Sequence, residues 1–234
     1  MTDVAMPGTL RRFVRSRADL VTGFVMLGSL AVTAAGAFAL VLEVPTWRGR
    51  QSVTHAARLI DEGDYAPAIR TLLGAVATAP QDARAHYYLG LAYARLGVVT
   101  GAMRQLSDAV RLAPGDPRVH DALGQTLREM GDSRAARREL EEAAHLDPGD
   151  PRYQIDLAGL LLDQGELAPA VERLRQAVRL RPRSAEIRLL LATALRRAGD
   201  YDGMVREYTK VRRLAPSNPL GEIARQALNE RGVR

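Results

Sequence analysis

Four histidines are the side chains of this sequence best suited to metal binding or acid–base chemistry, because cysteine is absent. Two of them, His86 and His120, lie thirty-four residues apart, so they could approach each other if that spacing were a structural repeat. A structural or catalytic metal centre normally needs a third or fourth ligand, and no further candidate accompanies the pair. We therefore interpret both as neutral, partly buried histidines, and we predict no metal site.

Motifs of other catalytic chemistries are also missing from the sequence. There is no Gly-rich phosphate loop after a strand, no His-Glu-x-x-His and no Ser elbow, and the carboxylates fall at helix caps or on solvated faces. The absence of cysteine excludes disulfide frameworks, thiolate metal sites and Cys nucleophiles. We predict that the protein is not an enzyme, has no cofactor and takes no small-molecule substrate.

The composition is that of a folded, helical protein. Hydrophobic residues make up 47% and charged residues 26%, while aromatics are only 5% and Ala, Leu and Arg are abundant. The net charge of +6 divides between residues 1–50 and the much longer remainder, which is nearly balanced. Because no basic patch is interleaved with aromatic residues, we predict no nucleic-acid partner.

An uncharged apolar stretch, residues 20–42, follows a short basic tail at residues 1–19. Twenty-three residues make a helix of roughly 34 Å, which is enough to cross a ~30 Å hydrocarbon core. The sequence therefore predicts one transmembrane helix, followed by a juxtamembrane linker at residues 43–48. A cleaved secretion signal is the alternative, since Ala37, Phe38 and Ala39 have the small-x-small pattern of a cleavage site.

Charges on the two sides of this stretch predict its orientation. The basic tail holds one more arginine than the segment that follows the span, and the richer side is expected in the cytoplasm. Arginine outnumbers lysine thirty-two to one, which is typical of a GC-rich bacterial genome. We expect a single-pass protein of the bacterial inner membrane, with the C-terminal part periplasmic. The membrane-flanking residues are Arg11, Arg12, Arg15, Arg17 and Trp47.

A period of thirty-four residues governs the rest of the chain. Gly recurs at 63, 97, 131, 165 and 199, and Pro recurs at 80, 114, 148, 182 and 216. Such a period predicts stacked helix-turn-helix units, in which the Gly ends the first helix and the Pro follows the second. Good N-cap residues stand two positions after each Pro: Asp82, Asp116, Asp150, Ser184 and Asn218.

The repeats resemble the tetratricopeptide repeat family. The resemblance is carried by LGLAYARLG at 89–97, the GDY sequences at 63–65 and 199–201, and the Ala and Pro columns of the period. It implies an all-α fold, a right-handed α-solenoid of five repeats with a capping helix. The repeats are placed at 49–82, 83–116, 117–150, 151–184 and 185–218, and the capping helix at 219–234. Its expected apolar face is Leu220, Ile223, Ala224, Ala227 and Leu228.

The same resemblance implies a concave groove, lined by the first helix of each repeat, that holds a segment of another protein. The side chains expected there are Tyr87, Leu91, Arg95, Asp121, Gln125, Arg128, Glu129, Ile155, Gly159, Leu162, Asp163, Leu189, Thr193, Arg196 and Arg197. A regular column of Arg50, Arg84, Arg118 and Arg152 has two interpretations. It is either a row of cations at the groove mouth for an acidic partner, or a set of arginines satisfied by the neighbouring cap aspartates.

Together these features predict a membrane-anchored scaffold that binds other proteins, in envelope assembly or secretion. Two alternatives stay open. One is a non-catalytic subunit of a membrane enzyme or transport complex, held through the transmembrane helix. The other is a soluble secreted repeat protein, released by signal cleavage.

Overall fold

The computed structural model describes residues 51–230 and 232, and these form helices and short turns without a strand. Residues 1–50 lie outside this part, so the predicted membrane span at 20–42 and its flanking residues stay predictions. No helix within 51–230 is both long and apolar enough to cross a bilayer.

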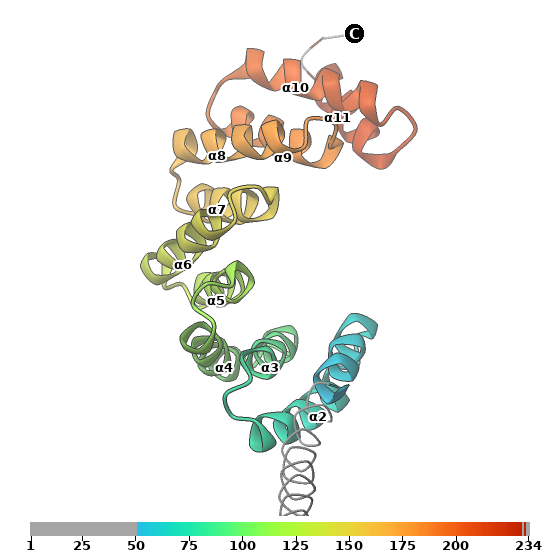
Figure 1. The fold of residues 1–234 in the computed structure, drawn as a ribbon. Coiled ribbons are helices and arrows are strands. Elements are labelled where there is room, and N and C mark those ends of the chain that lie inside the picture. The colour runs from blue at the N-terminus through green and yellow to red at the C-terminus, as the bar shows by residue number, and fades with distance from the viewer. Residues whose placement is uncertain (1–50, 231, 233–234) are drawn as a thin grey trace, which may run out of the picture. The chain divides into compact units, whose positions relative to one another are not determined.

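Helices follow one another in pairs, as the period predicts (Figure 1). A helix at 51–62 precedes α2, and the further pairs are α3 with α4, α5 with α6, α7 with α8, and α9 with α10, followed by α11. Their bounds are α2 Tyr65–Thr78, α3 Ala83–Arg95, α4 Val99–Leu112, α5 Pro117–Glu129, α6 Ser133–Leu146, α7 Pro151–Asp163, α8 Leu167–Leu180, α9 Ala185–Arg197, α10 Tyr201–Leu214 and α11 Pro219–Asn229.

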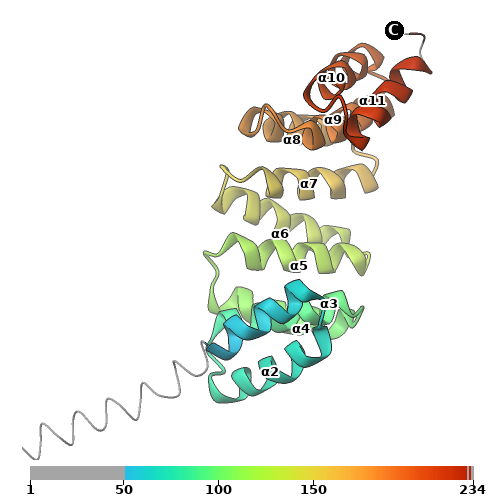
Figure 2. The same ribbon diagram turned by 90° about the vertical axis from the view of Figure 1, so that its right-hand side faces the viewer.

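Each helix packs on the next one in the chain, and the first helices of successive repeats also touch, α3 with α5 and α5 with α7. Figure 2 shows the pairs from α3 to α10 following one another in sequence order. This part of the chain is an all-α solenoid, in which each repeat contacts mainly its neighbours.

The turns are built as the sequence predicts. Gly63, Gly97, Gly131, Gly165 and Gly199 all have positive φ, between 73° and 87°, which a residue with a Cβ adopts only with strain. Side chains of the five predicted N-cap residues accept hydrogen bonds from backbone amides two or three residues on. The second helix of each repeat ends two residues before the recurring Pro.

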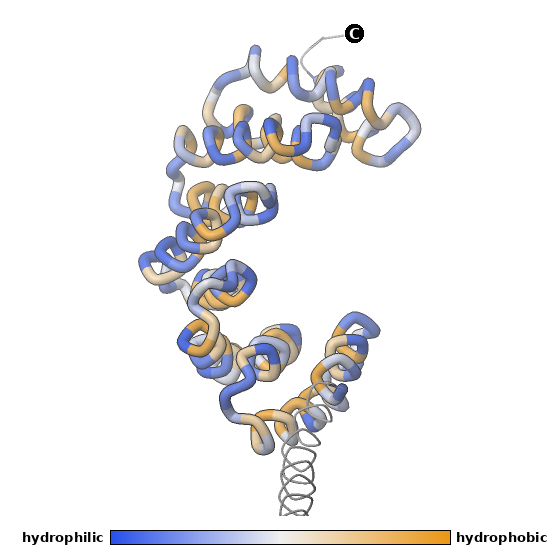
Figure 3. The backbone as a smooth tube through the Cα atoms, in the orientation of Figure 1, coloured by the Kyte–Doolittle hydropathy of each residue, from blue (hydrophilic) through white to orange (hydrophobic). Residues whose placement is uncertain are grey.

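The core is formed by the columns of the repeat. Ala68, Ala102, Ala136 and Ala170 are fully buried, as are Leu72, Leu106 and Leu140, and their counterparts Leu174, Met204 and Tyr208 are at most 2% exposed. These columns give the second helix of each repeat an apolar face, and Figure 3 shows hydrophobic and hydrophilic segments alternating along the tube.

A polar contact recurs inside the repeats, at equivalent positions nineteen residues apart. Nδ1 of His86 lies 2.9 Å from Oε1 of Gln105, and Nδ1 of His120 lies 2.8 Å from Oε2 of Glu139. The equivalent pairs, again nineteen residues apart, are Arg173 with Gln154 and Arg188 with Glu207. Nε2 of each histidine faces the carbonyl oxygen of the preceding Pro, at 3.1 Å for His86 and 2.9 Å for His120. The histidines therefore connect the two helices of their own repeats.

The capping helix α11 departs from the expectation at one residue. Ala224 and Leu228 are fully buried against the preceding helices, but Ile223 is 48% exposed and does not belong to the buried face. Successive residues of a helix point about 100° apart, so Ile223 is directed away from its buried neighbour Ala224 and lies at the border of the apolar stripe.

Candidate partner-binding groove

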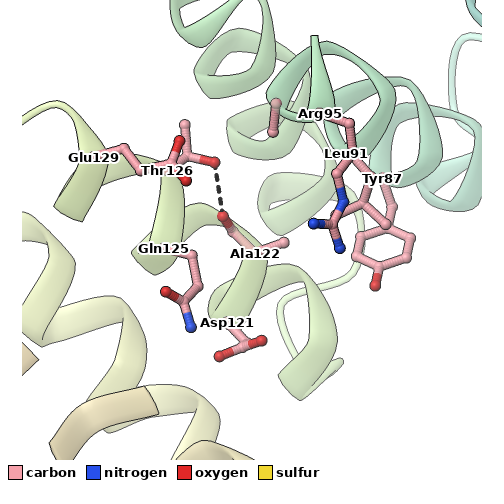
Figure 4. A pocket seen from close by; sticks show the side chains of 9 residues that line it. Tyr87, Leu91, Arg95, Asp121, Ala122, Gln125, Thr126 and Glu129 are labelled. Atoms are coloured by element: carbon pink, nitrogen blue, oxygen red, sulfur yellow. Dashed lines mark hydrogen bonds between the residues drawn. The ribbon is translucent and has the colours of Figure 1, made fainter. Parts of the chain in front are cut away.

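The first helices of the second and third repeats enclose a pocket of about 590 Å³ (Figure 4). It is lined by Tyr87, Leu91, Ala94 and Arg95 from α3 and by Asp121, Ala122, Gln125, Thr126 and Glu129 from α5. Residues four apart share a helix face, which is why Tyr87, Leu91 and Arg95 line one wall while Asp121, Gln125 and Glu129 line the other. The pocket therefore combines apolar surface with charges of both signs.

Six of the side chains that the sequence places in the groove thus meet in one pocket, and we call this surface the α3–α5 pocket. Its role in binding remains a prediction. Arg95 and Glu129 are exposed at its rim, whereas Tyr87, Leu91 and Asp121 are partly buried. Within α5, the hydroxyl of Thr126 donates to the carbonyl oxygen of Ala122 at 2.9 Å.

Tyr87 is the aromatic side chain of this pocket. Its ring packs edge-on against Tyr88, with centroids 5.1 Å apart, and the guanidinium of Arg118 lies 5.9 Å from its centroid. Burial raises the pKa of the Tyr87 phenol to about 12, because the charged form would lose its hydration. The hydroxyl therefore stays protonated at neutral pH and can donate a hydrogen bond.

Two guanidinium groups of the predicted arginine column bind the aspartates that cap their own helices. Arg118 binds Asp116 with Nη2 at 2.6 Å from Oδ2, and Arg152 binds Asp150 in the same way at 2.7 Å. These hydrogen bonds lower the pKa of both aspartates. The structure favours the cap interpretation for these two residues. For Arg84 it gives only a backbone hydrogen bond, from its amide to Asp82 at 3.0 Å.

Other predicted groove residues hold adjacent repeats together. Arg128 of α5 binds Asp163 of α7, with Nη2 2.5 Å from Oδ2. Arg197 of α9 donates to the carbonyl oxygen of Leu162 in α7 at 2.8 Å. Arg196 is exposed beside it. The first helices of repeats three to five are therefore joined by side-chain contacts across the groove face.

Asp156 is a residue of this surface that the sequence reasoning missed. It stands on α7, and Gln125 and Asp121 of α5 influence the pKa of its carboxyl group. Burial and the neighbouring Asp156 raise the pKa of Asp121 to about 7, and burial likewise raises the pKa of Asp156. An aspartate within the mostly apolar segment YQIDLAGLL was the available signal.

The arrangement of possible metal ligands was compared across the described residues. Between residues 51 and 230 no three His, Asp or Glu side chains are grouped so that they could hold an ion. His86 and His120 are each engaged within their own repeat, by Gln105 and Glu139 respectively.

Comparisons with known proteins identify the family. Family models described as "Tetratricopeptide repeat" match residues 53–117 and 160–219 in one case and 127–178 in the other. The chain belongs to the tetratricopeptide repeat family.

Solved structures of similar fold come from several bacterial proteins. One named "Functional Characterization of Pseudomonas Aeruginosa pilF" is 20% identical, with a TM-score of 0.67, covering 79% of this chain and 86% of that one. "MamA 41-end from Desulfovibrio magneticus RS-1" is 22% identical, with a TM-score of 0.65 and coverage of 73% and 97%. "Crystal structure of YrrB: a TPR protein with an unusual peptide-binding site" is 17% identical, with a TM-score of 0.60 and coverage of 75% and 90%. No curated protein matches the chain by sequence.

Proposed function

We propose that the protein is a non-catalytic scaffold that binds segments of other proteins in the α3–α5 pocket and along the adjoining first helices. The observation that carries this proposal is the convergence of Tyr87, Leu91, Arg95, Asp121 and Gln125 on one pocket of about 590 Å³. A cavity of this size accepts a few side chains of an extended or helical segment. YrrB, described as a repeat protein with an unusual peptide-binding site, supports the same use of the fold.

Capture experiments test this function. The chain is immobilised, and proteins bound from an extract of its own cells are compared between the unaltered protein and Tyr87→Ala/Arg95→Ala. The matched control is Arg104→Ala/Arg138→Ala, which removes two exposed arginines of the second helices α4 and α6. We expect the pocket variant to lose partners that the control retains, with equal helix content by circular dichroism. Identical partners on all three proteins would contradict the proposal.

We further propose that residues 20–42 anchor the scaffold in the inner membrane, with the repeats on the outer face, where they serve envelope assembly or secretion. The support is the uncharged apolar stretch and the richer positive charge before it. Labelling of a single introduced cysteine tests this placement, because the sequence contains no cysteine of its own. Gly115 is a suitable position, since it lies in the exposed turn before α5 and a side chain added there would meet open space. We expect Gly115→Cys to react with an impermeant thiol reagent in intact cells. Protection until lysis would place the repeats in the cytoplasm.

A further inference from the structure

A second pocket, of about 310 Å³, lies between the fourth and fifth repeats. The second helices α8 and α10 contribute to it, and so does α9, which packs against both of them. The lining residues are Arg175, Val178, Arg179, Arg188, Leu191, Leu195, Gly203, Arg206, Glu207 and Lys210. None of them lines the α3–α5 pocket, and we call this surface the α8–α10 pocket.

Positive charge dominates the lining of the α8–α10 pocket. Five of its side chains are arginines or lysine, and only Glu207 is acidic. Glu207 is engaged from two sides, by Arg188 at 2.6 Å and by Lys210 at 2.7 Å. This one carboxylate therefore balances only part of the charge around it.

The remaining cations have weaker partners. Glu172 of α8 lies 3.1 Å from Nη2 of Arg179 and 3.9 Å from Nη1 of Arg175. Both arginines are exposed, so water screens these contacts and little energy is lost when they are exchanged. Arg206 of α10 is also exposed, and within the described part of the chain it has no ion pair or hydrogen bond. Several cations are thus available to a ligand.

This charge is not a consequence of the repeat. The positions thirty-four residues before the six charged lining residues hold Glu141, His145, Gln154, Glu172, Arg173 and Gln176. One arginine and two acids stand there, where the α8–α10 pocket has five cations and one acid. In particular, Arg175 and Arg206 replace two glutamates. The cations are therefore concentrated at the joint between the fourth and fifth repeats and are not shared with the joint before it.

Apolar side chains accompany the cations. Val178 of α8 and Leu191 and Leu195 of α9 line the same pocket. A small anion such as phosphate would pair with the cations and leave this apolar surface uncovered. A protein segment that carries carboxylates on both sides of an apolar side chain matches both features, because guanidinium groups bind carboxylates in a bidentate manner and the apolar side chain covers the leucines.

We propose that the α8–α10 pocket is a second protein-binding site, which takes a short acidic segment of a partner protein. Carboxylates of this segment pair with Arg175, Arg206 and Lys210, and an apolar side chain between them packs on the leucines of α9. The site does not depend on the proposed groove function, because the two pockets have no lining residue in common.

Fluorescence polarisation tests this site, with the full-length chain in detergent and a labelled peptide in which one Leu is flanked by Glu on both sides. The variant Arg175→Glu/Arg206→Glu gives both positions the acid found one repeat earlier. We expect it to bind the peptide roughly tenfold or more weakly, because each exposed ion pair is worth up to about fivefold in affinity and the new acids repel the peptide. Binding to the unaltered protein should weaken between about 0.05 M and about 0.5 M salt, and a peptide with Gln in place of Glu should not bind.

The matched control is Arg104→Glu/Arg138→Glu, which makes the same change of net charge at exposed arginines that occupy the position of Arg206 in earlier repeats. We expect this control to bind the peptide as the unaltered protein does, with equal helix content by circular dichroism in both variants. If the pocket variant does not fold, Arg206→Gln replaces it, because Arg206 is exposed and supports no other described residue.

Three results would overturn the proposal. The first is that the peptide does not bind, and the second is that both double variants weaken binding equally. The third is displacement of the peptide by inorganic phosphate or phosphatidylglycerol at the peptide's own concentration, which would assign the pocket to a small anion or a lipid headgroup. The groove variant Tyr87→Ala/Arg95→Ala should bind the peptide unchanged, so a failure of this site is distinct from a failure of the α3–α5 pocket.

Discussion

Gly124 provides a sharp test of how the repeats pack, because it leaves no room for a methyl group. It lies in the middle of α5, and a Cβ there would come within 2.7 Å of Cγ and 2.9 Å of Cδ2 of Leu140, and 3.3 Å of the carbonyl oxygen of Ala136. Leu140 is fully buried, and its Cγ is close to the backbone of α6. Replacement of Gly124 by Ala therefore has to displace the Leu140 side chain or the helix α6 that carries it.

Two opposing contributions set the size of the effect. Gly→Ala in a helix interior gains about 1 kcal/mol of helix propensity. Overpacking a well-packed core costs about 1–3 kcal/mol, and the upper half of that range applies because the clash is with a branch point and not with a flexible end. The net expectation is a destabilisation of about 1–2 kcal/mol, or a fall in melting temperature of roughly 2–8 °C for a domain of this size.

Gly159 of α7 is the matched control. A Cβ at Gly159 would meet only the guanidinium of Arg128, with Nη1 at 3.0 Å, and that side chain is 32% exposed and can shift. Thermal and urea unfolding should show Gly124→Ala less stable than the unaltered protein and Gly159→Ala equal or slightly more stable. A Gly124→Ala protein as stable as its Gly159→Ala counterpart would refute the packing argument.

Two further substitutions have definite expected outcomes, each measured by urea unfolding. Gly131 has a φ of 81°, where a residue with a Cβ is strained, so Gly131→Ala should cost about 1–2 kcal/mol; a neutral result would mean that the turn can adopt another conformation. The ion pair of Arg188 with Glu207 spans 2.6 Å, with both side chains at most 13% exposed, so Arg188→Ala should leave a buried carboxylate without its main partner. Because Lys210 also binds Glu207 at 2.7 Å, the expected loss is about 1–3 kcal/mol, below that of an isolated buried pair; no loss would show that Lys210 suffices.

The turns were predictable from sequence because their chemistry is local. A left-handed Gly, an N-cap Asp and a helix-ending Pro act on the backbone within a few residues, so a thirty-four-residue period reveals them directly. The buried columns of the core were also predictable from the period, because Leu106 and Leu140 occupy equivalent positions of successive repeats, and both side chains are buried.

Side-chain pairing across helices was not predictable in the same way. His120 with Glu139 and Arg188 with Glu207 are separated by nineteen residues, and the sequence alone does not say which of many polar residues meet. The mutual effect of Asp156 and Asp121 on their pKa values was equally hidden, because it depends on how two neighbouring repeats are rotated against each other. The two interpretations of Arg118 likewise needed the position of its guanidinium, which lies on Asp116.

Site-specific photo-crosslinking tests the central claim of groove binding most directly. A crosslinking amino acid replaces Arg95, which is exposed at the rim of the α3–α5 pocket, or Arg104, which is exposed on α4 of the same repeat. Irradiation of living cells should give a discrete crosslinked protein from position 95, lost when Tyr87→Ala is added, and none from position 104. Equal crosslinking from both positions, or from position 104 alone, would contradict the account.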